Sequence, residues 1–223
     1  MDLAIIFLGI LVIPCILFAV TSAIYNKYKD VNNTKKLSGF EIAREILDDH
    51  NLEDVYIVEV KGNLNDHYDY DQKVLRLSSD VFHGESVTSA VVAARIANYA
   101  IQDKDNYTFM KFRSSFNKVI TFVNYIAYIL FLVALCVKDI AVMKTANIAI
   151  VFVFIFHIVT LPVEYDVCRR TIKELKLFSI LDSKDIKDAD ILFKISPYTF
   201  IVSIITCVSN LISEIMYNIQ RRG

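Results

Sequence analysis

The sequence predicts a helix-dominated α+β membrane protein with about four transmembrane helices and one small extramembrane domain. The first observation is composition: 55% of the 223 residues are hydrophobic, and the mean hydropathy of +0.43 exceeds that of most soluble domains. The second is a series of four apolar runs, and the third is a polar stretch that carries both helix and strand patterns. The net charge of −1, without any block of Lys and Arg, argues against a nucleic-acid partner. The expected partner is therefore the lipid bilayer.

The apolar runs are long enough, or nearly so, to cross a hydrocarbon core of about 30 Å. They extend over Leu3–Ile24, Val119–Val137, Ala146–Leu161 and Tyr198–Tyr217. Only Asp2 precedes the first run, and no small-residue cleavage site follows it, so we interpret this run as a retained anchor. The lysines that follow it are Lys27, Lys29, Lys35 and Lys36. By the positive-inside rule, they predict a multi-pass cell-membrane protein whose main polar domain is cytoplasmic.

These features divide the chain into five segments. They are an N-terminal anchor over 1–24, an extramembrane domain over 25–118, a transmembrane hairpin over 119–161, a charged helical segment over 162–196, and a C-terminal transmembrane helix with its tail over 197–223. The four cysteines have no paired spacing, and three lie in apolar runs, so we interpret them as small hydrophobic residues.

Local patterns in the extramembrane domain predict a helix, two strands and a second helix. Ser38 and Glu41 fit a capping box, which begins a helix that ends near His50. Alternating residues predict strands over Val55–Val60 and Lys73–Leu77. Turn-forming residues from Asn65 to Asp71 separate the two strands. An Ala- and Val-rich helix is expected from Ser86 to Gln102.

Several motifs follow one another along the chain in a recognisable order. They read G-N-L-N-D-H-Y-D from Gly62, K-V-L-R-L-S from Lys73, D-V-F-H-G from Asp80, V-V-A-A from Val91 with A-I-Q from Ala100, and T-L-P-V-E-Y-D from Thr160. Together with the pattern of apolar runs, this ordered set resembles the bacterial membrane-bound neutral zinc metallopeptidases over nearly the whole chain. The resemblance implies a zincin-like extramembrane domain and, in an active member, zinc-dependent hydrolysis of peptide bonds.

The helix that should bind zinc departs from the family pattern. In the family it carries H-E-x-G-H, in which two His at i and i+4 bind Zn²⁺ and the Glu acts as general base. Here Arg95, Ile96 and Tyr99 stand at the first His, the base and the second His. Arginine keeps its proton, isoleucine cannot accept one, and a lone tyrosine is a poor ligand. We therefore expect no intact catalytic residue and no cofactor.

The resemblance identifies Glu164, in the L-P-V-E motif, as a vestigial third zinc ligand. A buried carboxylate that has lost its cation is costly unless another positive charge replaces it. One hypothesis is that the guanidinium of Arg95 occupies the vacated space and forms a charge pair with Glu164. The alternative is that Arg95 extends to solvent while Glu164 caps a helix.

Related peptidases bind substrate along a strand beside the active helix, which suggests strand addition. The substrate-binding candidates are His67, Tyr68, Lys73, Val74, Leu75 and Arg76. For His67 the competing interpretation, which we favour, is a structural residue of a turn. His157 lies two helical turns before Glu164, and we expect it to be hydrogen-bonded within the helix bundle.

The sequence thus favours an inactive member of the peptidase family that binds polypeptide, acts as a scaffold or regulates an active paralogue. One alternative is an active zinc peptidase with non-standard ligands. Those ligands would come from His67, His83, Glu85 and Glu164. A second alternative is a small transporter or channel subunit, although the apolar runs contain few ionisable residues and no inverted repeat.

Overall fold

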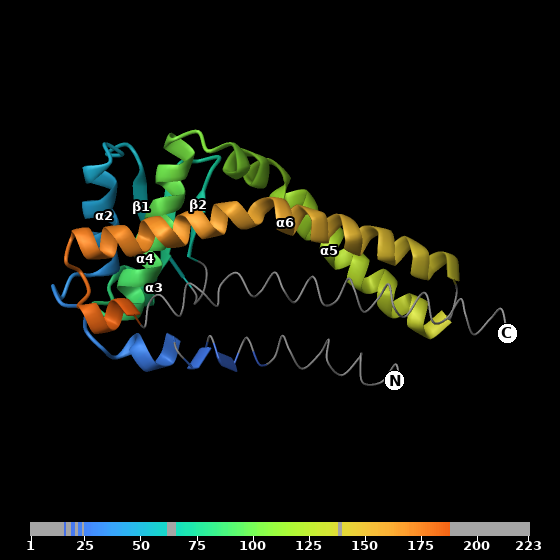
Figure 1. The fold of residues 1–223 in the computed structure, drawn as a ribbon, viewed down its shortest axis with the longest axis horizontal. Helices are drawn as coiled ribbons and strands as arrows, with labels where there is room; N and C mark the ends of the chain where they lie inside the picture. Colours follow the sequence, from blue (N-terminus) through green and yellow to red (C-terminus); the bar gives the residue numbers. More distant parts are fainter. Residues whose placement is uncertain are drawn as a thin grey trace. The chain divides into compact units, whose positions relative to one another are not determined.

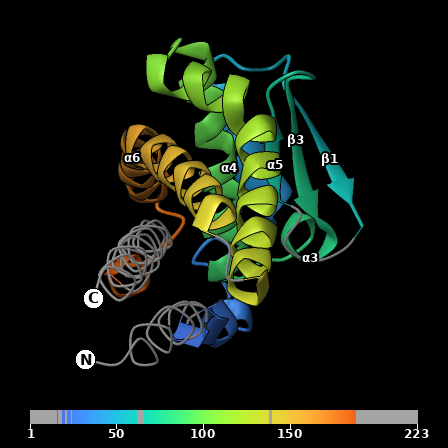
Figure 2. The same ribbon diagram turned by 90° about the vertical axis from the view of Figure 1, so that its right-hand side faces the viewer.

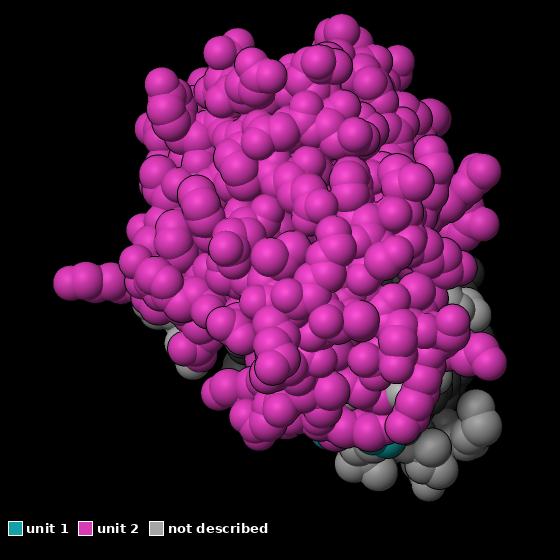
Figure 3. All heavy atoms as spheres, turned by 90° about the vertical axis from the view of Figure 1, so that its left-hand side faces the viewer, with its two compact units in different colours: residues 1–19, 112–161, 197–223 teal, residues 20–111, 162–196 magenta. Residues whose placement is uncertain are grey.

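The computed structural model describes residues 16, 19–20, 22–23, 25–61, 66–137 and 140–187. The chain divides into two compact units, which are described separately below. Unit 1 comprises residues 1–19, 112–161 and 197–223, and unit 2 comprises residues 20–111 and 162–196 (Figure 3).

Unit 2 contains a small sheet and most of the shorter helices (Figure 1). In chain order its elements are α2 (Gly39–Asp49), β1 (Tyr56–Val60), β2 (His67–Asp69), β3 (Val74–Ser78), α3 (Ser79–Phe82) and α4 (Val87–Lys104). The long helices α5 (Thr108–Val137) and α6 (Ile140–Leu177) each run through both units. The predicted helices and strands match α2, β1, β3 and α4 to within a few residues.

The sheet has the strand order β1-β3-β2, so β3 is the central strand. It pairs in parallel with β1, where Ile57 faces Leu75, and antiparallel with β2, where Tyr68 faces Leu75. The prediction of a continuous turn from Asn65 to Asp71 is wrong, because β2 lies within it. Three residues are too few to show a strand period, and β2 is defined by its pairing with β3.

Helix α4 is the centre of unit 2. The Ser86 side chain accepts a hydrogen bond from the Ser89 N–H at the start of the helix. Almost every residue from Val87 to Gln102 is buried, because α4 lies between the sheet and the 162–177 part of α6 (Figure 2). A helix that is covered on several sides needs no polar face, which explains its uniform Ala- and Val-rich sequence. The alanines also let the neighbouring elements approach closely.

The predicted capping box at the start of α2 is confirmed. The Ser38 hydroxyl accepts from the Glu41 N–H, and the Glu41 carboxylate accepts from the Ser38 N–H at 2.7 Å. Ile42, Ile46 and Leu47 are fully buried on the inner face of the helix. At the other end, Asn51 adopts a left-handed conformation with φ of 52°, which ends the helix after His50.

Gly39, the first residue of α2, allows this helix to pack directly on the backbone of α3. A Cβ at position 39 would lie 2.2 Å from the carbonyl oxygen of Val81, a contact that only a backbone shift can relieve. We expect Gly39→Ala to lower the free energy of unfolding by about 1–3 kcal/mol, as overpacking does elsewhere. Chemical denaturation of the purified chain measures the effect. An unchanged unfolding midpoint would contradict this account of the α2–α3 contact.

In unit 1, the 112–137 part of α5 packs on the 140–161 part of α6. Ile120, Val153 and Phe156 form one apolar cluster, and Ala127 packs with Ile150 in another. Several large apolar side chains of these helices are exposed, among them Phe122, Ile129, Ile148 and Phe152.

The prediction of about four transmembrane helices is wrong. Within the described residues, one helix, Lys144–Leu177, is long and apolar enough to cross a membrane, and it contains the predicted run Ala146–Leu161. The apolar stretch found in α5, Lys118–Ala127, is shorter than the predicted run Val119–Val137. Although α5 has 30 residues, an apolar stretch as short as Lys118–Ala127 cannot cross a hydrocarbon core of about 30 Å. The predicted runs Leu3–Ile24 and Tyr198–Tyr217 lie largely or wholly outside the described residues.

Candidate functional site

The candidate site lies where α4 faces α6 within unit 2. Positions 95 and 99 are four residues apart on α4, so their side chains project from the same face of the helix. Glu164 projects from α6, just after Pro162, which is accommodated inside that helix. The sequence motifs V-V-A-A and L-P-V-E, far apart in the chain, are therefore brought together here.

Glu164 accepts hydrogen bonds from both α4 side chains. The guanidinium Nη2 of Arg95 lies 2.5 Å from Oε2 of Glu164, and the hydroxyl of Tyr99 donates to Oε1 at 2.8 Å. Glu164 is only 3% exposed. A carboxylate this deeply buried requires charge compensation and hydrogen bonds, and these two partners supply both. The alternative in which Arg95 extends to solvent and Glu164 caps a helix does not describe this arrangement.

The electrostatics of the site keep Arg95 positively charged. Burial by itself would lower the pKa of the Arg95 guanidinium. The nearby acidic groups of Tyr99 and Glu164 outweigh this effect, and the pKa lies above its ordinary value. Arginine therefore remains a cation here and has no lone pair to offer a metal.

A polar network continues from the Arg95–Glu164 pair along the same two helices. The Gln102 amide donates to Asp166 at 2.7 Å and to the Val163 carbonyl at 3.2 Å. Arg170 pairs with Asp166 at 2.7 Å and with Asp105 at 2.5 Å. The second acidic residue of the L-P-V-E-Y-D motif is thus engaged by two side chains and binds α6 to α4.

The residues present at the family's zinc positions do not fit zinc. A catalytic zinc ion requires three protein ligands with lone pairs, usually His or carboxylate. Arg95 is a cation, and the phenol of Tyr99 is a hydrogen-bond donor to Glu164. Ile96, at the position of the base, is a buried apolar side chain. Only Glu164 is a suitable ligand, and its oxygens already accept from Arg95 and Tyr99.

The alternative ligand set drawn from His67, His83, Glu85 and Glu164 does not converge. His67 is exposed on β2, and His83 lies 3.3 Å from Glu59. Glu85 is also exposed. Within the part of the chain that the structure describes, none of these four residues belongs to a group of three close ligand side chains. His157, which precedes Glu164 by two helical turns in the sequence, belongs to unit 1, whereas Glu164 belongs to unit 2.

The substrate-binding candidates are largely engaged within the domain. Tyr68 is buried and its hydroxyl donates to Asp103 at 2.8 Å; burial, and then Asp103, raise its pKa. Lys73 also pairs with Asp103, and Leu75 is fully buried. Arg76 lies 3.4 Å from Asp69.

The expected strand addition along Lys73–Leu77 is wrong for a topological reason. Val74–Ser78 forms the central strand, whose backbone is paired with β1 on one side and with β2 on the other. An additional strand can join only at an edge of a sheet. Among the described strands, the edges belong to β1 and β2.

A helix that presents positions i and i+4 toward a carboxylate from a second helix is the framework of an H-E-x-x-H metallopeptidase, here with both histidines replaced. The chain belongs to the neutral zinc metallopeptidase family: the family profile described as "Putative neutral zinc metallopeptidase" matches residues 3–218. The resemblance inferred from the ordered motifs is thereby confirmed.

Among curated proteins, the chain is similar to the "Putative membrane protease YugP" of Bacillus subtilis (strain 168), with 32% identity over 146 residues. The match covers 66% of this chain and 65% of the relative, so the chain spans just under two thirds of that protein's length. No solved structure matches the chain.

Proposed function

We propose that this protein is a non-hydrolytic member of the metallopeptidase family that binds polypeptides without cleaving them. The observation that carries the proposal is the contact of Arg95 and Tyr99 with the two oxygens of Glu164. The positive charge that a metal would bring is supplied by a fixed guanidinium. The position of the general base is held by Ile96, which can neither accept nor donate a proton.

Polypeptide binding is proposed for the outer edge of β2. Among the described strands, β2 pairs only with β3, and it is tied to α4 by the Tyr68–Asp103 hydrogen bond. An extended segment that added to this edge would run beside α4, as a substrate does in related peptidases. Binding of this kind suits a scaffold or a regulator of an active paralogue.

We further propose a membrane location with unit 2 on the cytoplasmic side. One apolar helix of sufficient length, and similarity to a protein named as a membrane protease, support the membrane location. Lysines 27, 29, 35 and 36 all lie in unit 2 and support its orientation.

Fluorescently labelled casein tests the function. The purified full-length chain, supplied with ZnCl₂, is expected to raise the fluorescence anisotropy of casein in a saturable way and to release no acid-soluble fluorescence. The Glu164→Gln variant should likewise release no acid-soluble fluorescence. Cleavage that requires zinc and is lost in Glu164→Gln would overturn the proposal and establish an active peptidase with non-standard ligands. Absence of saturable casein binding would refute the polypeptide-binding part.

A further inference from the structure

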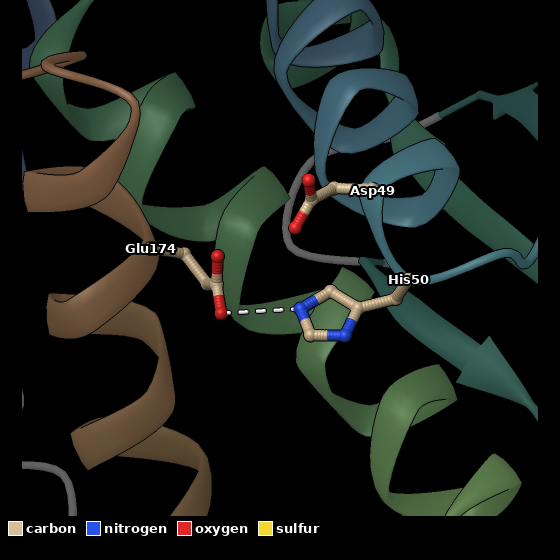
Figure 4. Close-up of side chains that lie close together, drawn as sticks. All are labelled: Asp49, His50 and Glu174. Atoms are coloured by element: carbon tan, nitrogen blue, oxygen red, sulfur yellow. Dashed lines mark hydrogen bonds and ion pairs between the residues drawn. The ribbon is translucent and has the colours of Figure 1, made fainter.

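A second group of ligand side chains lies in unit 2, away from Arg95 and Glu164. Asp49 and His50 come from the C-terminal end of α2, and Glu174 comes from α6 (Figure 4). One ligand atom from each lies within 4.8 Å of the other two, and Nε2 of His50 is 3.2 Å from Oε1 of Glu174.

Glu174 is the residue that most needs a partner. It is 4% exposed, and its Oε2 has no hydrogen-bond partner among the residues that the structure describes. A buried carboxylate oxygen without a donor or cation is costly. In Figure 4 the Glu174 carboxylate is directed toward both α2 side chains, Asp49 and His50.

A pocket of about 460 Å³ adjoins this group and is lined by both His50 and Glu174. Asn98 also lines it, and the buried Oδ1 of Asn98 likewise has no partner within the described residues. Two buried acceptor oxygens without donors beside one pocket point to a cation or its bound water as the missing partner.

The positive side chains nearby do not satisfy these oxygens. Arg170 is paired with Asp105 and Asp166, and Lys104 donates to the backbone carbonyls of His50 and Asn51. Arg169 and Lys173 line the pocket, but both are exposed.

From this geometry we propose that Asp49, His50 and Glu174 bind a divalent transition-metal cation, with Zn²⁺ as the best match. One imidazole and two carboxylates form a common zinc ligand set, and their two negative charges balance the ion. Zinc–ligand distances of about 2.1 Å place two ligands of a tetrahedral site about 3.4 Å apart. The His50–Glu174 separation of 3.2 Å is already close to that spacing.

Metal binding changes the tautomer of His50. Without metal, the Nε2–H of the neutral imidazole donates to Glu174; ligation through Nε2 requires that hydrogen to be on Nδ1, so the imidazole stays neutral and no net proton is released. The fourth coordination position would open toward the pocket and hold water. The metal would join the end of α2 to α6, two segments 124 residues apart in the chain. This role is independent of whether the α4 site hydrolyses peptides.

Isothermal titration of the metal-free full-length chain with ZnCl₂ alone tests the site. We expect one Zn²⁺ per chain and, at 100-fold excess over Kd, a rise in unfolding temperature of about 5–10 °C. Glu174→Gln is expected to weaken zinc binding by at least about 100-fold. Asp49→Asn changes an exposed side chain, so it should leave the fold intact while weakening zinc binding by about tenfold or more.

His83→Ala, which removes another histidine beside a carboxylate, and Glu164→Gln are the controls, and both should retain zinc binding. Zinc binding that survives Glu174→Gln and Asp49→Asn would overturn the proposal. Loss of zinc only in Glu164→Gln would refute both this site and the proposed non-hydrolytic function. Stabilisation by inorganic phosphate and not by zinc would instead assign the pocket to an anion held by Arg169 and Lys173.

Discussion

Arg95→Met is expected to lower the free energy of unfolding by about 3–5 kcal/mol, because it leaves the buried Glu164 carboxylate without its counter-ion. The side chain of Glu164 is 4% exposed, so water cannot replace the guanidinium. Tyr99 would still donate to one oxygen, but a neutral phenol does not compensate the charge. Chemical denaturation of the full-length chain measures the loss.

The double variant Arg95→Met with Glu164→Met should recover most of this stability, since replacing both members of a buried ion pair by apolar side chains is often neutral or stabilising. Arg76→Met is the matched control. Arg76 has the same 28% side-chain exposure as Arg95, but its partner Asp69 is 22% exposed, so we expect a loss below about 1 kcal/mol. Equal losses in the two single variants would show that Glu164 does not depend on Arg95.

Restoring the family motif is the second change with a large expected effect. The triple variant Arg95→His, Ile96→Glu and Tyr99→His should bind one additional zinc ion per chain. The two imidazoles would stand at i and i+4 on α4, and Glu164, released from Arg95 and Tyr99, would supply the third ligand. Elemental analysis after dialysis measures the stoichiometry, and labelled casein reports any gain of hydrolysis.

Two controls separate zinc binding from catalysis in this background. Adding Glu164→Gln should remove the additional zinc. Keeping Ile96 while changing Arg95 and Tyr99 to histidine should retain the zinc but reduce casein hydrolysis by about 10²–10⁴-fold, the usual contribution of a general base. If the folded triple variant gains no zinc, α4 and α6 do not preserve the spacing of a metallopeptidase site.

Much of the local structure could be predicted from sequence because its determinants lie within a few residues of one another. The capping box of Ser38 and Glu41 marks the start of α2, and alternating residues mark β1 and β3. The replacement of the zinc ligands was also visible, since a helical i, i+4 motif is a local pattern. The partnership of Arg95 with Glu164 could be formulated as a hypothesis because ordered motifs indicated which segments meet.

The features that sequence did not reveal depend on contacts between distant segments. Strand β2 is too short to show a period, and the central position of β3 follows from pairing on both sides. The sequence gives no sign that Tyr99 donates to Glu164, because the two residues are 65 positions apart and meet only when α4 packs on α6. Asp49 and His50 gave no signal either, since a helix end with an acid and a histidine is common.

By itself, then, the sequence determined the family, the main helices and strands of unit 2, and the loss of both zinc-binding histidines. Each of these follows from short-range patterns or from the order of motifs along the chain. The tertiary structure decided which strand is central, how many described helices can span a membrane, and that Asp49, His50 and Glu174 converge. The physical reason is that strand pairing and the approach of α2 to α6 are set by packing between segments remote in the chain.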